Sequence, residues 1–344
     1  MRQWVLRDVE AMIEEEACSP ALPAGFMRIR PAYCGICGSD LHSYQGKHPL
    51  VHPPIVLGHE FSGTVVEVGP EVDPKWRGRM VTAIPSLACG TCYACRRGQE
   101  HICHRLRVIG NVGAAGALAE ELVVPMQNVL ALPAAVNLKA GALVEPLAVA
   151  VHALRRADLV GGQALVMGAG PIGLLTGLAG RALGMTSVAI TDVRPARLQL
   201  AAALGLHPID ASLRGWQQAV GSLWDDGADA IFDCVATTVT ANAALALARQ
   251  GSTVVLVGVP EEPLELDAIK IQDNELDFKG SAMYRRDDFS TALRLLENRG
   301  VDVNPLITAV LPWAQVDDAF RRLVHDPGDA VKVLIRVGGT SGTP

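Results

Sequence analysis

The sequence predicts a two-domain α/β protein, in which a small β-rich domain precedes a doubly wound parallel sheet with helices on both faces. Three observations predict it. The chain has 344 residues, which is more than one small core needs. Residues 1–145 contain short β-rich runs and many turns. From residue 163 onward strands and helices alternate, which is typical of a parallel sheet.

The first domain is expected to be a barrel-like β domain with long loops. Its strands are rich in Val, Ile and Phe, and clusters of Gly and Pro such as KHPLVHPP separate them. The expected strands cover residues 26–33, 61–69, 79–85 and 120–125.

The second half predicts the parallel sheet. Apolar runs of strand length are followed by segments with helical spacing. The expected strands cover residues 163–170, 187–192, 228–235, 252–259 and 276–282, and a last strand covers 331–337. The expected helices cover residues 171–183, 194–205, 240–251, 287–299 and 313–325. Residues 338–344, GGTSGTP, are expected to form a frayed tail.

Composition argues against several classes of function. The net charge is −6, and no basic run exceeds two residues, so we do not expect a nucleic-acid binder. The first residues, MRQWVLRDVEAMIEEE, carry early acids and no long apolar core, so we expect neither a signal peptide nor a membrane span. The protein is therefore expected to be cytoplasmic, where thiols stay reduced.

A glycine-rich loop predicts a dinucleotide site. GAGPIG at 168–173 has the spacing G-x-G-x-x-G, follows a strand and opens a helix, as in a Rossmann sheet. Gly168 permits the turn, Gly170 lets the backbone approach a pyrophosphate, and Gly173 lets helix and sheet touch. The helix N-terminus favours the phosphate charge. The other expected cofactor-binding residues of this loop are Pro171 and Ile172.

Asp192 indicates which dinucleotide is bound. It ends the next strand, where its carboxylate can accept hydrogen bonds from a ribose diol and would repel a 2′-phosphate, which favours NAD over NADP. The alternative is that Asp192 caps the following helix. Arg194 or Arg197 could instead bind a phosphate, and Arg197 is counted among the expected cofactor-binding residues.

Four cysteines within fifteen residues predict a structural zinc site. Their spacing is C-x2-C-x2-C-x7-C, and four thiolates close a tetrahedral shell that has no position for substrate. Disulfides are the alternative, which a reducing compartment disfavours. The chemistry is therefore expected in CGICGSDLH at 34–42 and GHEF at 58–61. The four cysteines are Cys89, Cys92, Cys95 and Cys103.

Five motifs occur in the order found in zinc-dependent medium-chain alcohol and polyol dehydrogenases. They are YCGICGSDLH, PIVLGHEFSGTVVEVG, the four-cysteine segment, EPLAVAVHAL and GAGPIG. The chain resembles this family over nearly its whole length, and ALVEPLAVAVHALRR resembles the sorbitol (polyol) dehydrogenase branch most. The resemblance implies a GroES-like catalytic domain at 1–147, a Rossmann NAD-binding domain at 148–284, and a segment at 285–344 that returns to the catalytic domain.

The resemblance also implies a catalytic zinc. Cys37 and His59 match its ligands, and Glu60 and Glu145 lie beside it in the family, whose members differ over which glutamate binds the metal directly. The residues alone permit another interpretation, with Cys37 as a buried apolar residue and His59 as a hydrogen-bonded core histidine. One catalytic and one structural Zn²⁺ are thus expected in each chain, besides NAD.

Ser39 and His42 match the family's proton relay, in which the serine takes the hydroxyl proton and the histidine passes it outward. Without the resemblance, Ser39 would be interpreted as a turn residue and His42 as a surface residue. Asp40 is expected to be structural, and Cys34 is expected to be a packing residue that binds no metal.

Five further histidines are expected to play no part in metal binding. His48 and His52 lie in a proline-rich loop and are expected to be solvated, with substrate contact as the alternative. His101 and His104 flank the last of the four cysteines and are expected at the surface, whereas His152 is expected to be a packing residue.

The resemblance implies hydride transfer to NAD from a secondary alcohol, with a polyol or sugar alcohol as the expected substrate. The sorbitol branch commonly has an Arg-Tyr pair where this chain has Met283 and Tyr284, which counts against sorbitol itself. Arg285 or Arg286 could bind a sugar acid or phosphate, or could be solvated. Threonine 3-dehydrogenase and butanediol dehydrogenase activities stay open.

Two other classes of protein fit the sequence less well. The negative charge and the dinucleotide motif argue against a zinc protein that binds nucleic acid or a partner. A sensor without activity would be expected to lack Cys37 or His59, and both are present. The expected partners are a small alcohol and further copies of the chain, with no nucleic acid and no membrane. Pairing of sheet edges through 252–259 would give a dimer, and bacterial relatives are often tetramers.

Overall fold

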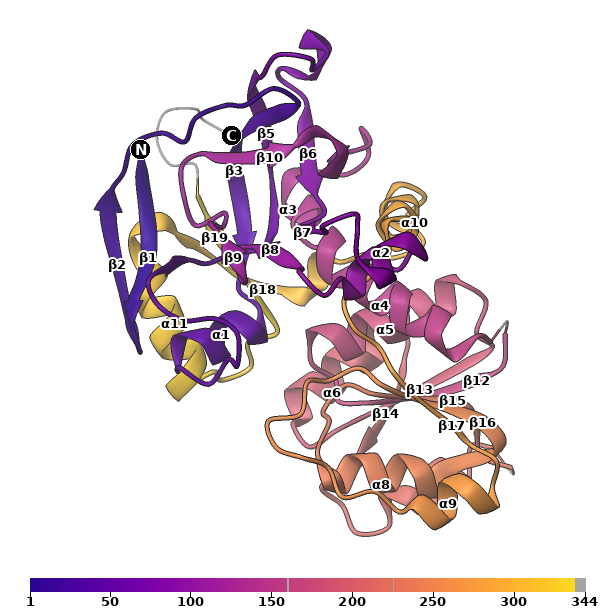
Figure 1. Cartoon of the computed structure of the whole chain (residues 1–344). Coiled ribbons are helices and arrows are strands. Elements are labelled where there is room, and N and C mark those ends of the chain that lie inside the picture. The colour runs from indigo at the N-terminus through magenta and orange to yellow at the C-terminus, as the bar shows by residue number, and fades with distance from the viewer. Residues whose placement is uncertain (160, 225, 338–344) are drawn as a thin grey trace. The chain divides into compact units, whose positions relative to one another are not determined.

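A computed structural model describes residues 1–159, 161–224 and 226–337 (Figure 1). The chain divides into two compact units: Met1–Glu145 together with the segment from Val303 onward, and Pro146–Asp302. The segment that returns to the first unit therefore begins at Val303, whereas the expected segment begins at residue 285. The tail expected at 338–344 lies outside the described residues.

The helix α10 (Arg286–Glu297) belongs to the second unit because a buried carboxylate ties it to α4 (Val144–Ala157). Asp288 is fully buried, and its Oδ2 lies 2.9 Å from His152 Nδ1. Its Oδ1 lies 3.0 Å from Arg155 Nη1. A buried charge is stable only when it is paired and hydrogen-bonded, so Asp288 fixes one helix to the other. This explains why the expected boundary at 285 was wrong.

The first unit consists mainly of strands. In the described residues these are β1 (Arg2–Asp8), β2 (Ala11–Glu16), β3 (Phe26–Gly35), β4 (Ile55–Val56), β5 (Glu60–Val68), β6 (Met80–Ala83), β7 (Ser86–Leu87), β8 (Arg107–Ile109), β9 (Gly113–Ala114), β10 (Leu122–Pro125), β11 (Val129–Ala131), β18 (Ile307–Pro312) and β19 (Lys332–Arg336). The helices are α1 (Gly38–Tyr44), α2 (Tyr93–Arg96), α3 (Leu138–Gly141) and α11 (Val316–His325). Short 3₁₀ turns cover Pro74–Trp76, Glu100–Ile102, Met126–Asn128, Asn304–Leu306 and Trp313–Gln315.

The main sheet of this unit has the order β11-β6-β5-β3-β19-β18, and β10 also pairs with β3 (Figure 1). The strand β19 runs antiparallel to β3, with Leu334 opposite Gly35, while Glu60 at the start of β5 lies opposite the same glycine. The C-terminal segment thus becomes part of the main sheet of the first unit. The four strands expected here formed, whereas the hairpin β1–β2 and the strand β18 were missed.

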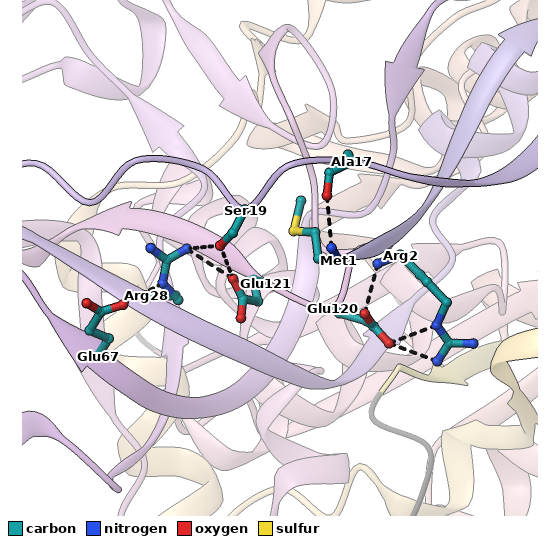
Figure 2. A network of polar contacts seen from close by, with 8 residues as sticks. All are labelled: Met1, Arg2, Ala17, Ser19, Arg28, Glu67, Glu120 and Glu121. Carbon is teal, nitrogen blue, oxygen red and sulfur yellow. Dashed lines mark hydrogen bonds and ion pairs between the residues drawn. The ribbon is translucent and has the colours of Figure 1, made fainter.

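Ion pairs tie several strands of this unit together, as Figure 2 shows. Arg28 on β3 is only 9% exposed and contacts Glu67 on β5 at 2.8 Å and Glu121 at 3.1 Å. The neighbouring Glu120 accepts bonds from both the backbone and the guanidinium of Arg2. These Arg2 bonds lower the pKa of Glu120, chiefly through the backbone N–H. The two glutamates therefore anchor the start of β10 to β1 and β3.

The second unit contains the expected parallel sheet. Its described elements are β12 (Gln163–Met167), α5 (Pro171–Ala182), β13 (Ser187–Asp192), α6 (Pro195–Ala203), β14 (His207–Asp210), α7 (Trp216–Gly221), β15 (Ala228–Asp233), α8 (Thr238–Leu247), β16 (Ala248–Leu256), α9 (Ala268–Asp273) and β17 (Asp277–Gly280). The strand order is β14-β13-β12-β15-β16-β17. Within the described ranges, none of the helices has the length and apolar character that crossing a membrane requires.

The sheet order corrects one expectation about assembly. β16 contains most of the segment 252–259 and pairs with β15 on one side and β17 on the other. Its backbone groups are therefore already bonded, and it cannot pair with a second sheet. The edges of the described sheet are β14 and β17.

The role assigned to Asp288 predicts a stability effect. Asp288→Ala should lower the free energy of unfolding by about 2–3 kcal/mol, because it removes the buried partner of His152 and Arg155. Urea unfolding followed by tryptophan fluorescence measures this. Asp287→Ala, which removes the exposed acid one residue earlier, should change stability by no more than about 0.5 kcal/mol. Equal effects of the two substitutions would contradict the assignment.

Candidate active site

Two segments of the first unit bring a thiol, an imidazole and a carboxylate together. Cys37 directly precedes α1, His59 directly precedes β5, and Glu60 is the first residue of β5. One ligand atom from each lies within 4.8 Å of the others. Both His59 and Glu60 are buried. Thiolate, imidazole and carboxylate are the donors that zinc accepts, so these residues fit a zinc ion by their chemistry.

Asp40 orients two members of this cluster. Its Oδ2 accepts the backbone N–H of Cys37 at 2.9 Å, and its Oδ1 lies 3.4 Å from His59 Nδ1. The contact leaves the other ring nitrogen of His59 for a metal. Burial lowers the pKa of His59, but the charges of Asp40 and Cys37 outweigh burial and raise this pKa well above its ordinary value. The pocket therefore attracts positive charge.

Lys332 is a further member that the sequence analysis missed. Its Nζ donates to both oxygens of Glu60, at 2.8 and 2.7 Å, and to the carbonyl of Ile36 at 3.1 Å. Burial lowers the pKa of Lys332, but the Glu60 carboxylate outweighs burial and raises it above its ordinary value. The available signal was a lysine directly before three apolar residues in the strand KVLIR.

Glu145 does not belong to the group of ligand atoms defined above. It lies in the first turn of α4, is 6% exposed, and its charge contributes to raising the pKa of Lys332.

Ser39 and His42 lie three residues apart on α1 and therefore on one face of it, both half-buried. The Ser39 carbonyl accepts a bond from Ser43 Oγ.

Several expectations about single residues can be compared with the structure. Cys34 is fully buried, as expected of a packing residue, and burial raises its pKa well above the ordinary value. His52 and His104 are exposed, as expected. His101 is only 8% exposed, so its expected surface position is wrong: it lies in the 3₁₀ turn Glu100–Ile102, which buries the side chain.

His48 is half-buried, whereas a solvated position was expected. Its Nδ1 accepts the backbone N–H of Leu50 at 3.2 Å. Burial lowers the pKa of His48, and the charges of His42 and His59 lower it further. The His48 N–H also donates to the His42 carbonyl at 3.2 Å, so this loop is held against α1. A proline-rich sequence gives no means of predicting that contact.

The four-cysteine segment forms a second cluster. Its sulfur atoms lie within 4.8 Å of one another, with separations of 3.4 Å for Cys92–Cys95, 3.8 Å for Cys92–Cys103 and 3.9 Å for Cys89–Cys95. All eight cysteines carry free thiols. Four sulfurs around a zinc ion at about 2.3 Å would lie about 3.8 Å apart, so this cluster fits a closed zinc shell.

Backbone N–H groups support thiolates in this cluster. The N–H groups of Cys89 and Arg105 both point at Cys103 Sγ, each at 3.3 Å. The backbone N–H of Thr91 is the main cause that lowers the pKa of Cys89 to about 5. Burial, however, raises the pKa of Cys95 to about 12. The surroundings therefore favour the thiolate, the form that zinc binds, at Cys89 but not at every sulfur of the loop.

The glycine-rich loop of the second unit has the geometry that a dinucleotide requires. Gly168 has a φ of +93°, a backbone conformation that would be strained for a residue with a side chain. A Cβ on Gly173 would lie 1.8 Å from the Gly168 carbonyl oxygen, so α5 can pack there only without one. At Gly170 the nearest atom to a Cβ would be Arg197 Nη1, 3.7 Å away. The protein itself does not fill this position, which leaves it open to a ligand.

Asp192 holds the same loop. Its Oδ2 accepts the N–H of Ala169 at 2.8 Å and lies 3.6 Å from Arg197 Nη1. Its Oδ1 accepts the N–H groups of Val193 and Arg194. The helix α6 begins at Pro195 with Arg194 as its N-cap, so Asp192 is not the cap that the alternative interpretation suggested. It ends β13 and connects the strand end to the glycine loop.

The segment after β17 buries its tyrosine and exposes its two arginines. Tyr284 is only 2% exposed and packs edge-on against Phe289, with ring centroids 4.8 Å apart. Arg285 and Arg286 are both exposed, where α10 begins. The two arginines are thus accessible to solvent, and the tyrosine ring is a core residue.

A zinc-type ligand cluster in a β domain and a glycine-rich loop on a parallel sheet define a metal-dependent dehydrogenase. Comparison with known families agrees. Residues 23–134 match the alcohol dehydrogenase GroES-like domain, and residues 171–298 match the zinc-binding dehydrogenase family.

Individual proteins give the same result. L-Idonate 5-dehydrogenase of Vitis vinifera is 33% identical over 98% of this chain and 94% of its own length. Sorbitol dehydrogenase of Arabidopsis thaliana is 35% identical over 92% of this chain and 90% of its own length. The chain therefore belongs to the zinc-dependent medium-chain alcohol and polyol dehydrogenase family, and it is an alcohol oxidoreductase.

Solved structures share the fold. A dehydrogenase from Sinorhizobium meliloti 1021 bound to NADP has a TM-score of 0.91 and 28% identity, over 97% of this chain and 98% of its own. An alcohol dehydrogenase from Escherichia coli CFT073 in complex with NADH also has a TM-score of 0.91 and 28% identity, over 98% of this chain and 99% of its own. Relatives of the same fold are thus known with either dinucleotide.

The sulfur cluster yields a prediction about metal content. Cys92→Ser should reduce bound zinc by about one equivalent per chain and destabilise the loop 89–103, because three thiolates no longer close the shell. Elemental analysis of the purified protein and limited proteolysis measure the two effects. Cys18→Ser, at an exposed thiol, is the matched control and should retain all its metal. An unchanged zinc content in Cys92→Ser would contradict the assignment.

Proposed function

We propose that this enzyme oxidises a secondary hydroxyl group of a polyol or sugar acid to a ketone, with NAD as the hydride acceptor. The observation that carries the proposal is the cluster of half-buried Cys37 with buried His59 and Glu60, in a chain of the zinc-dependent dehydrogenase family. The relatives named for idonate and sorbitol support the substrate class.

Cys37 and His59 are the proposed zinc ligands, with Glu60 or Glu145 as the third protein donor. A zinc ion held there would supply Lewis acidity, which lowers the pKa of bound water to about 7 and should act similarly on an alcohol. Asp40 keeps the His59 ring in one orientation, and its bond to the Cys37 N–H positions the thiolate. The cluster thus holds its donors before any ligand arrives.

Ser39 and His42 are proposed to carry the hydroxyl proton outward. Their spacing of three residues places both on one face of α1, which begins next to Cys37. The Ser43 hydroxyl donates to the Ser39 carbonyl, which holds the backbone of this helix in place. A positioned acid or base of this kind typically contributes 10²–10⁴-fold to the rate.

NAD is the proposed dinucleotide, and its nicotinamide ring accepts the hydride. Gly168, Gly170 and Gly173, with Pro171 and Ile172, are proposed to bind its pyrophosphate at the start of α5. Asp192 is proposed to accept the ribose hydroxyls. Arg197 lies against both Asp192 and the open position above Gly170, so it is proposed to contact the cofactor.

We further propose that the protein is cytoplasmic and assembles as a homo-oligomer, a dimer or tetramer. Eight free thiols suit a reducing compartment. The edge strand β17 has one unpaired side in the described sheet, and exposed apolar side chains lie elsewhere on the same unit. These exposed side chains include Val239, Val259 and Ile269. Both features are typical of surfaces that pair with another copy.

Substrate and metal dependence are tested in one assay. NADH absorbance at 340 nm should appear with one or more members of a panel of pentitols, hexitols, diols, threonine, aldonic acids and sugar phosphates, and a chelator should abolish it. A sugar acid as the best substrate would favour Arg285 or Arg286 as its contact. Absence of activity with every alcohol in the panel would contradict the proposal.

Cys37→Ala should abolish turnover and metal binding at the cluster while NAD still binds, because the cluster loses its only thiolate. Steady-state rates, zinc content and NAD titration by fluorescence measure this. Cys34→Ala is the matched control, since it removes a buried thiol three residues away that is outside the cluster. Full activity in Cys37→Ala would show that the zinc assignment is wrong.

Asp192→Ala should raise KM for NAD and narrow the preference for NAD over NADP, because it removes the proposed ribose acceptor and the charge facing a 2′-phosphate. The ratio of kcat/KM for the two cofactors is the measurement. Asp273→Ala, which removes an exposed carboxylate from the same unit, should leave the ratio unchanged. An unchanged NAD affinity in Asp192→Ala would overturn the ribose role.

A further inference from the structure

The buried ion pair between Lys332 and Glu60 lies directly against the proposed zinc site. Lys332 is 2% exposed, and Glu60 is completely buried. Both carboxylate oxygens accept bonds from the ammonium group, and the Ile36 carbonyl holds the ammonium in place. A Cβ on Gly35 would lie 2.2 Å from Glu60 Oε2, so the carboxylate occupies the space above this glycine. The position of Glu60 is therefore fixed from two sides.

The chain offers more possible protein donors to the proposed catalytic zinc than a catalytic zinc site uses. Cys37, His59 and Glu60 offer ligand atoms within 4.8 Å of one another. Glu145, the alternative third donor, would make four, which is enough to close a tetrahedral zinc shell. A catalytic zinc site must keep one position for the substrate oxygen, whereas a closed shell is structural. The chain therefore has to prevent either Glu60 or Glu145 from binding the zinc ion permanently.

We propose that Lys332 is the positioning residue that does this, by holding Glu60 beside the metal without letting it close the shell. The inference rests on the proposed zinc site. An ammonium that binds both oxygens withdraws negative charge from the carboxylate and competes with the metal for it. Glu60 then remains a weak donor that the substrate oxygen can replace.

Lys332→Met tests the proposal in the full-length protein. Without the ammonium group, Glu60 is a buried anion whose nearest cation is the metal, so it becomes a firm ligand. With Co²⁺ in place of zinc, the visible spectrum of the variant should no longer respond to added imidazole, which enters an open position in the wild type. Removal of Co²⁺ from this site by a chelator should become roughly 10-fold slower or more, and kcat should fall.

Two further variants separate this effect from a general loss of structure. Lys332→Arg keeps the charge and should keep the imidazole response. Lys332→Met combined with Glu60→Gln removes both charges and should regain it, because the neutral amide is a poor ligand. If Lys332→Met does not fold, Lys332→Gln is expected to change the spectrum in the same direction.

The outcomes distinguish the inference from the function on which it rests. An imidazole response in Lys332→Met equal to that of the wild type, or faster loss of Co²⁺, would overturn the positioning role and leave the zinc site intact. A wild-type protein that binds Co²⁺ only at the four cysteines would overturn the proposed function, and the role of Lys332 with it.

Discussion

Compensation of buried negative charge is the constraint on which the first unit depends. Asp40 and Glu60 are each no more than 1% exposed and lie around one histidine. Carboxylates removed from water need partners, and here backbone N–H groups, His59 and Lys332 provide them. The same concentration of charge makes the pocket a site for a cation. Packing of the sheet and binding of the metal therefore depend on the same residues.

In the second unit, backbone N–H groups compensate the negative charge of buried carboxylates. Asp192 and Asp233 stand at the ends of β13 and β15, and both are buried. Asp192 accepts three backbone N–H groups, and Asp233 accepts those of Val235 and Ala236 as well as the Thr240 hydroxyl. Burial raises the pKa of Asp233, which these bonds partly offset. The carboxylates order the loops at the strand ends, where ligands bind to sheets of this kind.

Much of the fold could be predicted from local patterns. The strands at 163–170 and 187–192 and the helix after GAGPIG formed where the periodicity indicated, because a parallel strand buried on both faces is a nearly continuous apolar run. The hairpin β1–β2 was missed because β2 carries three consecutive glutamates, and β14 because HPID is too short for a periodicity. The burial of His101 and Tyr284 depends on what packs over them, which no local pattern records.

By itself, the sequence determined the chemical identity of the site. The spacing of four cysteines and of three glycines acts through adjacent backbone, so each loop carries its own geometry. Only the tertiary structure decided which distant residues complete the metal cluster. Lys332 reaches Glu60, 272 positions away in the chain, because β19 pairs with β3 next to β5. Long-range strand pairing sets that contact, and a one-residue shift in register would turn the lysine to the other face of the sheet.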